Sequence, residues 1–158
     1  MDKSGDKYTR LWITIMFIGE YSYTIDTKRR MAIPVKFRKD LGKKAVLTRG
    51  LDNCLYLYSM SEWEKLAKKL SDLPISRSDS RAFSRLMLAG AMEVSLDGLG
   101  RILIPDYLKE YASLNKKAIL AGLYNRVEIW SESKWKSYKK QTENEVENIA
   151  EKMNELGI

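Results

Sequence analysis

One short loop occurs twice in the sequence, and this repeat limits what the chain can fold into. IDTKRRMAIP spans 25–34 and LDGLGRILIP spans 96–105, so each copy reads apolar, Asp, three residues, Arg, three residues, Pro. The two copies are 71 positions apart, whereas LYLYS at 55–59 and VEIWS at 127–131 are 72 apart. A repeat of this length indicates one structural unit present twice, and a one-residue insertion near 48–50 explains the change of offset.

Each unit has the pattern of four short strands closed by a helix. Apolar, β-branched and aromatic residues bounded by turn residues predict the strands. In the first unit, apolar residues at 63, 66, 67 and 70 predict a helix with Ser61 as its N-cap candidate, and the segment from Ser133 resembles it. The predicted strands are 21–25, 31–33, 45–48 and 54–58 in the first unit, and 92–96, 102–104, 118–121 and 126–130 in the second.

The chain therefore divides into an N-terminal extension at 1–15, a first unit at 16–75, a second unit with a linker helix at 76–140, and an acidic C-terminal helix or tail at 141–158. Met16 is a candidate start of the functional product. Phe83, Leu86 and Met87 lie at helical spacing in the linker, which we expect to pack on the body. Either unit alone buries little surface, so we expect the two to interlock into one barrel-like body.

Composition excludes several functions. The chain has no histidine and one cysteine, which removes Ser-His and Cys-His nucleophile pairs and a thiolate zinc site. We find no catalytic constellation, metal cluster or cofactor fingerprint, and expect neither an enzyme nor a bound cofactor. Cys54 lies in a strand-like setting and is predicted to be buried, in keeping with a cytoplasmic protein. The apolar run 11–18 is too short to cross a membrane.

Charge points to a polyanion partner. The net charge is +7, with +5 in each unit and −4 over 142–158. Lys28, Arg29 and Arg30 make the first loop strongly basic, whereas the second loop has Arg101. Arginine is suited to bidentate contacts with guanine and phosphate. An alternative stays open at this point, because Asp26 and Asp97 could cap their turns while each Arg pairs with its Asp.

Several longer segments carry a family resemblance. FIGEYSYTIDTKRRMAIPVKFR, RAFSRLMLAGAMEVSLD, DGLGRILIP and VEIWSESKW together resemble the MraZ family of bacterial transcriptional regulators, which is associated with the division and cell-wall gene cluster. The resemblance runs from about residue 16 to about 138. It implies a mainly β fold with added helices (α+β), built from two tandem AbrB-like units that form a swapped-hairpin, double-split β-barrel.

The resemblance also implies a function. Members assemble into ring-like homo-oligomers whose loops bind double-stranded DNA at short direct repeats upstream of their own operon, in the cytoplasm and associated with the nucleoid. Carried over by position, the DNA-facing candidates are Arg30 and Arg101, with Lys28, Arg29, Asp26 and Asp97 beside them. We expect Arg to meet DNA and Asp to position the Arg or the turn, since phosphate repels a carboxylate.

The first loop departs from the family, which commonly has Lys-Gly-Arg where this chain has Lys28, Arg29 and Arg30. If Gly100 adopts a positive φ, the same conformation costs Arg29 about 1 kcal/mol or more. The first loop is therefore expected either to differ in shape or to use Arg29 for a phosphate contact. Two alternative functions are an antitoxin-like protein-interaction module of the AbrB type and a nonspecific nucleoid-binding protein.

Overall fold

The computed structural model describes residues 16–158, so the predicted extension at 1–15 lies outside the described residues. The first repeat forms β1 (Phe17–Thr24), β2 (Arg30–Ala32), α2 (Val35–Leu41), β3 (Lys44–Arg49), β4 (Leu55–Ser59) and α3 (Met60–Ser71). The linker forms α4 (Ser78–Ser84) and a π-helical turn (Arg85–Ala89). The second repeat forms β5 (Met92–Ser95), β6 (Arg101–Leu103), α5 (Asp106–Tyr111), β7 (Lys117–Tyr124), β8 (Val127–Ser131), α6 (Glu132–Asn144) and α7 (Val146–Asn154).

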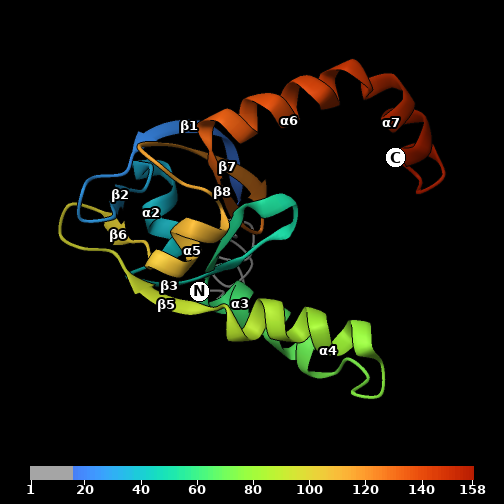
Figure 1. The fold of residues 1–158 in the computed structure, drawn as a ribbon, viewed down its shortest axis with the longest axis horizontal. Coiled ribbons are helices and arrows are strands. Elements are labelled where there is room, and N and C mark those ends of the chain that lie inside the picture. Colours follow the sequence, from blue (N-terminus) through green and yellow to red (C-terminus); the bar gives the residue numbers. More distant parts are fainter. Residues whose placement is uncertain (1–15) are drawn as a thin grey trace, which may run out of the picture.

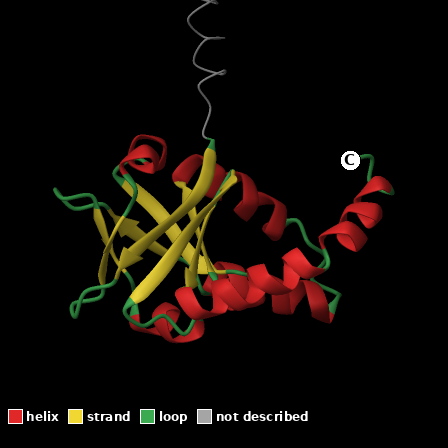
Figure 2. Ribbon diagram, turned by 90° about the horizontal axis from the view of Figure 1, so that it is seen from above, coloured by secondary structure: helices red, strands yellow, loops and turns green. Residues whose placement is uncertain are grey.

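The two repeats exchange their first strands. β1 pairs antiparallel with β7 of the second repeat along its whole length, and β5 pairs with β3 of the first repeat. A six-stranded sheet of order β1-β7-β8-β4-β3-β5 results, and β2 pairs with β6 in a separate ribbon. The strands wrap around one core with the helices outside (Figures 1 and 2). This arrangement confirms the predicted duplicated swapped-hairpin barrel.

The core explains why neither repeat buries its apolar surface alone. Phe17 from β1 and Leu120 from β7 are fully buried in one cluster with Leu47 of the first repeat and Ile102 of the second. Burial of a large aliphatic or aromatic side chain contributes about 1.5–3 kcal/mol. Because these side chains come alternately from both repeats, the two halves depend on each other for stability.

Two short helices were not predicted from the sequence. Proline ends each preceding strand as expected, but Pro34 also precedes α2 and Pro105 precedes α5. Proline is favoured at the start of a helix because its missing N–H has no partner there. Phe37 and Leu41, four residues apart on α2, are buried in the main core. Each helix is too short for sequence periodicity to identify it.

The strand registers correct the position of the insertion. Ala45 pairs with Ser59 in the first repeat, and Ala118 pairs with Ser131 in the second. The offset is therefore 73 between β3 and β7 and 72 between β4 and β8. Two residues are inserted before β7 and one is lost after it, so the predicted single insertion near 48–50 was wrong.

Serine residues cap both long helices, two residues earlier than predicted for the first. The Ser59 hydroxyl accepts a hydrogen bond from the N–H of Glu62 (3.3 Å), so Ser59 rather than Ser61 is the N-cap. The Ser131 hydroxyl accepts equivalently from Lys134 (3.2 Å). An N-cap of this type contributes about 1 kcal/mol. Both caps fall on the last residue of the preceding strand, which joins strand and helix without a loop.

The linker packs on the barrel through its π-helical turn, whereas α4 has no buried residue. Met87 of the π-helical turn is buried, and the Thr48 hydroxyl donates to its carbonyl oxygen (2.6 Å).

At the C-terminal end of the chain, α6 runs to Asn144, beyond the predicted unit boundary at position 140, and α7 follows after Glu145. Figure 1 shows α6 carrying α7 away from the barrel. None of the helices within residues 16–158 has the length and apolarity needed to cross a membrane.

Replacing Gly122 with alanine is expected to destabilise the protein. A Cβ at Gly122 would lie 2.5 Å from the backbone carbonyl carbon of Phe17 and from the amide nitrogen of Ile18. Because β1 is held to β7 by its whole ladder, we expect Gly122→Ala to lower the free energy of unfolding by about 1–3 kcal/mol. Urea unfolding measures the change. Gly98→Ala is the control, since its Cβ meets no atom within 4 Å; equal stability of the two variants would contradict the prediction.

Candidate nucleic-acid interface

The exchange of strands brings both repeated loops to one end of the molecule. They project side by side, blue and yellow, beyond β2 and β6 (Figure 1). In the β2–β6 ribbon Met31 pairs with Ile102, and both side chains are buried. Arg30 pairs with Leu103, and Ala32 with Arg101. The two arginines therefore share the outer face of the ribbon as diagonal neighbours, about 7–8 Å apart.

Each loop is shaped by its aspartate. Asp26 Oδ1 accepts hydrogen bonds from the N–H groups of Lys28 and Arg30, each at 2.9 Å. Asp97 Oδ1 accepts from Leu99 and Arg101 at the same distances. The backbone N–H of the loop arginine is the main cause that lowers the pKa of each carboxyl below its ordinary value. Both aspartates are thus turn-forming residues, as one of the sequence-based alternatives held.

The aspartates also hold the arginine side chains. Arg101 Nε donates to Asp97 Oδ2 at 2.9 Å, and Arg30 Nε lies 3.4 Å from Asp26 Oδ2. About a third of each arginine side chain remains exposed, 34% for Arg30 and 29% for Arg101. The carboxylate therefore contacts one edge of the guanidinium. It fixes the direction of the side chain while part of the side-chain surface remains open to a ligand.

The two loops have the same backbone shape despite their different sequences. Gly100 has φ 73° and Arg29 has φ 63° at the equivalent position. Their carbonyl oxygens accept reciprocal hydrogen bonds, from Ile33 N–H to Gly100 (2.9 Å) and from Ile104 N–H to Arg29 (2.8 Å). The expectation that the first loop differs in shape was therefore wrong. Arg29 adopts the left-handed conformation at a cost of roughly 1–2 kcal/mol.

The surroundings explain why one position takes Arg and the other Gly. A Cβ at Gly100 would meet the guanidinium group of Arg38, whose Nε donates to the carbonyl oxygen of Ile33 (2.8 Å). The Arg29 side chain instead reaches the second repeat, where Nη1 lies 3.2 Å from Asp106 Oδ1. Each loop thus contacts the short helix of the other repeat.

Sequence reasoning missed the role of α2 in the site. Arg38, Lys39 and Lys43 line a cavity beside Asp97 and Gly100 of the second loop. Their position beside the second loop follows from a helix that was not predicted. The tips of the two loops differ in charge. The first loop has the exposed Lys28 where the second loop has Leu99, which is 67% exposed. Cations from the first repeat therefore flank both loops.

Elsewhere in residues 16–158, the buried polar side chains have hydrogen-bond partners within the chain. Glu128 is 7% exposed and accepts from Arg126 Nη2 (2.9 Å) and Trp130 Nε1 (3.0 Å). Cys54 is buried, as predicted, and burial raises the pKa of its thiol well above the ordinary value. Among residues 16–158, no group of three or more Cys, His, Asp or Glu side chains is placed to hold a metal ion.

The fold and the site define a class of protein: a tandem AbrB-like barrel that displays two Asp-Arg loops on a basic β-ribbon. A family model described as "MraZ protein, putative antitoxin-like" matches the chain twice, over residues 16–86 and 87–156, and the chain belongs to the MraZ family. The two matches also confirm the duplication.

Close relatives agree with this assignment. Proteins named transcriptional regulator MraZ from Natranaerobius thermophilus, Clostridium tetani and Clostridium acetobutylicum are 50%, 51% and 52% identical to the chain over 143 residues. Each alignment covers 90% of this chain and all of the relative.

Arg29→Gly is expected to stabilise the fold. The substitution removes the left-handed strain of about 1 kcal/mol and loses an exposed ion pair worth little. Thermal or urea unfolding should show a free energy of unfolding equal to or up to about 1 kcal/mol above that of the original chain. Arg29→Ala is the control, because it loses the ion pair and keeps the strain. A clear loss of stability in Arg29→Gly alone would contradict the left-handed conformation of residue 29.

The contribution of Asp97 to stability should depend on pH. Its pKa is lowered in the folded state, so the stabilisation is complete above the ordinary aspartate pKa near 3.9 and is lost as the pH falls through the lower folded value. Urea unfolding of the original chain and of Asp97→Ala should therefore differ most at neutral pH and converge below about pH 4. Asp97→Asn keeps a side-chain oxygen for the two N–H groups and should lie between them. A difference that stays constant down to pH 3 would contradict this role.

Proposed function

We propose that the protein regulates transcription by sequence-specific binding to double-stranded DNA through the β2–β6 ribbon and its two loops. The observation that carries the proposal is the display of Arg30 and Arg101 on one outer face of a two-stranded ribbon. A ribbon of this kind fits the major groove, and arginine pairs there with the O6 and N7 atoms of guanine. Under this proposal the two arginines read base edges.

The other loop residues have different roles. Lys28 and Arg29 contact phosphates beside the first loop, and Arg38, Lys39 and Lys43 supply cations beside the second. Phosphate contacts position a protein on the duplex, whereas base contacts specify the sequence. Asp26 and Asp97 orient the arginines and do not face the phosphates, because both oxygens of each carboxylate are engaged within its own loop.

The proposed active form is a ring-like homo-oligomer on short direct repeats upstream of the division and cell-wall operon, acting in the cytoplasm at the nucleoid and without catalysis. One ribbon contacts few base pairs. Several ribbons linked in one assembly raise the apparent affinity for spaced repeats through their effective concentration. The family membership, and the name transcriptional regulator that the relatives carry, support the regulatory part of this proposal.

The central test is fluorescence anisotropy with DNA from upstream of the gene and a scrambled duplex of equal length. Arg30→Ala and Arg101→Ala should each weaken binding to the native duplex by roughly 1–3 kcal/mol and narrow the preference over the scrambled one. Lys136→Ala is the matched control, because it removes an exposed cation on α6, away from the ribbon.

Measurement at two salt concentrations separates the alternatives. A preference that survives at higher salt supports sequence reading. Equal binding of both duplexes that salt abolishes would indicate a nonspecific nucleoid-binding protein. Absence of DNA binding, together with a stoichiometric unrelated protein on purification, would indicate the antitoxin-like interaction module.

A further inference from the structure

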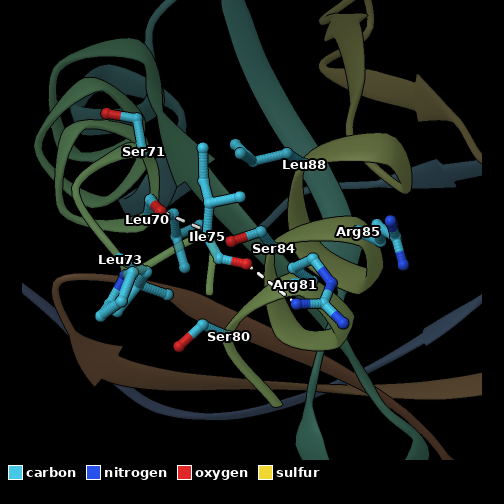
Figure 3. Close-up of a pocket in the computed structure, with 10 residues that line it drawn as sticks. Leu70, Ser71, Leu73, Ile75, Ser80, Arg81, Ser84, Arg85 and Leu88 are labelled. Atoms are coloured by element: carbon cyan, nitrogen blue, oxygen red, sulfur yellow. Dashed lines mark hydrogen bonds between the residues drawn. The ribbon is translucent and has the colours of Figure 1, made fainter. Parts of the chain in front are cut away.

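A small apolar groove lies between α3 and α4, on the opposite side of the barrel from the loops. Leu70 and Leu73 from α3 and its connection, with Leu88 from the π-helical turn, form its apolar lining, and the cavity has a volume of about 260 Å³. Figure 3 shows Leu70, Ile75 and Leu88 around this space. Ile75 is 82% exposed, which is unusual for a large aliphatic side chain in a cavity wall.

Two hydrogen bonds join residues that line the α3–α4 groove. Arg81 Nη1 donates to the Ile75 carbonyl oxygen (2.9 Å), and the Ser84 hydroxyl donates to the Leu70 carbonyl oxygen (3.4 Å), both dashed in Figure 3. Arg81 and Arg85 also line the cavity, so its rim is cationic. Residues 60–90 carry six basic and four acidic side chains. A complementary partner would present a few apolar side chains among carboxylates.

The C-terminal segment of this chain has that chemistry. Val146, Ile149 and Met153 lie on one face of α7 at spacings of three and four, and we name them the α7 stripe. Val146 is 55% and Ile149 36% exposed, and neither belongs to the core clusters of the described chain. Residues 142–158 carry five acidic side chains and one basic. An apolar helical face in a groove is a recurrent mode of recognition.

The repeat explains why α7 lacks a partner. The second family match extends to residue 156, so α7 occupies in the second repeat the place that α4 holds in the first. The chain from α4 returns to the barrel through buried Met87 and enters β5, which anchors that helix. α7 follows α6 away from the barrel, and nothing in residues 16–158 returns it (Figure 1).

We propose that the α7 stripe of one subunit packs into the α3–α4 groove of a neighbouring copy, with the glutamates of α7 facing Arg81 and Arg85. The two surfaces differ, so the contact is heterologous, and a pair of subunits joined by it keeps one free groove and one free tail. Repetition of such a contact closes a ring or extends a filament. The inference rests on the proposed self-assembly and names the surface that produces it.

Sedimentation velocity of the full chain tests the proposal with two double variants. Ile75→Glu with Arg85→Glu disables the groove, and Ile149→Glu with Met153→Glu disables the tail. Each variant alone is expected to be monomeric where the original chain is oligomeric. An equimolar mixture should form a heterodimer and nothing larger, because one intact groove meets one intact tail. Leu51→Glu is the control, since it changes an exposed apolar residue, 51% exposed, outside both surfaces.

The outcomes separate this inference from the proposed function. Circular dichroism and urea unfolding check that every variant is folded. Assembly of either variant like the original chain, or a mixture that stays monomeric, would overturn the interface and leave a DNA-binding oligomer intact. A monomeric original chain that binds its DNA would remove the ring and the interface together, while DNA recognition by the ribbon would stand.

Discussion

Two backbone hydrogen bonds, from Ile33 to Gly100 and from Ile104 to Arg29, join the repeated loops to each other. They are possible because each repeat gives its first strand to the other repeat's side of the barrel. β2 and β6 have only three residues each and would not form a stable ribbon alone. The barrel beneath them supplies the missing stability by burying Met31 and Ile102. The geometry of the site therefore depends on the whole fold.

In each loop the aspartate orders the arginine side chain through an ion pair. An arginine side chain has many rotamers, and ordering it on binding costs up to about 2 kcal/mol. The Asp four residues earlier restrains it before any ligand arrives, while its other oxygen fixes the turn. The carboxylate lowers the net charge of the loop, and the cations of α2 and of the first loop compensate for that loss. The aspartate therefore orients the arginine, whereas the surrounding cations supply the positive charge that would attract a polyanion.

Much of this could be predicted from sequence, for physical reasons. The eight strands and the repeat were predicted because β-branched and aromatic residues between turn residues give a clear local signal. The helices α2 and α5 were missed because six or seven residues show too little periodicity, and the role of Arg38 was missed with them. The loop shape at Arg29 could not be predicted, because local preference opposes a positive φ there. Hydrogen bonds from the other repeat impose it.

The fusion of both repeats in one chain has a consequence for orientation. An AbrB-like barrel made from two identical chains would carry identical loops, and its ribbon would read the same from either end. Here one loop has Lys28 and Arg29 where the other has Leu99 and Gly100, although the backbone is the same. The two ends of the ribbon therefore differ chemically. If the ribbon reads DNA as proposed, this polarity would let it distinguish the two strand directions of an asymmetric sequence, which would suit it to sites arranged in tandem more than to palindromes.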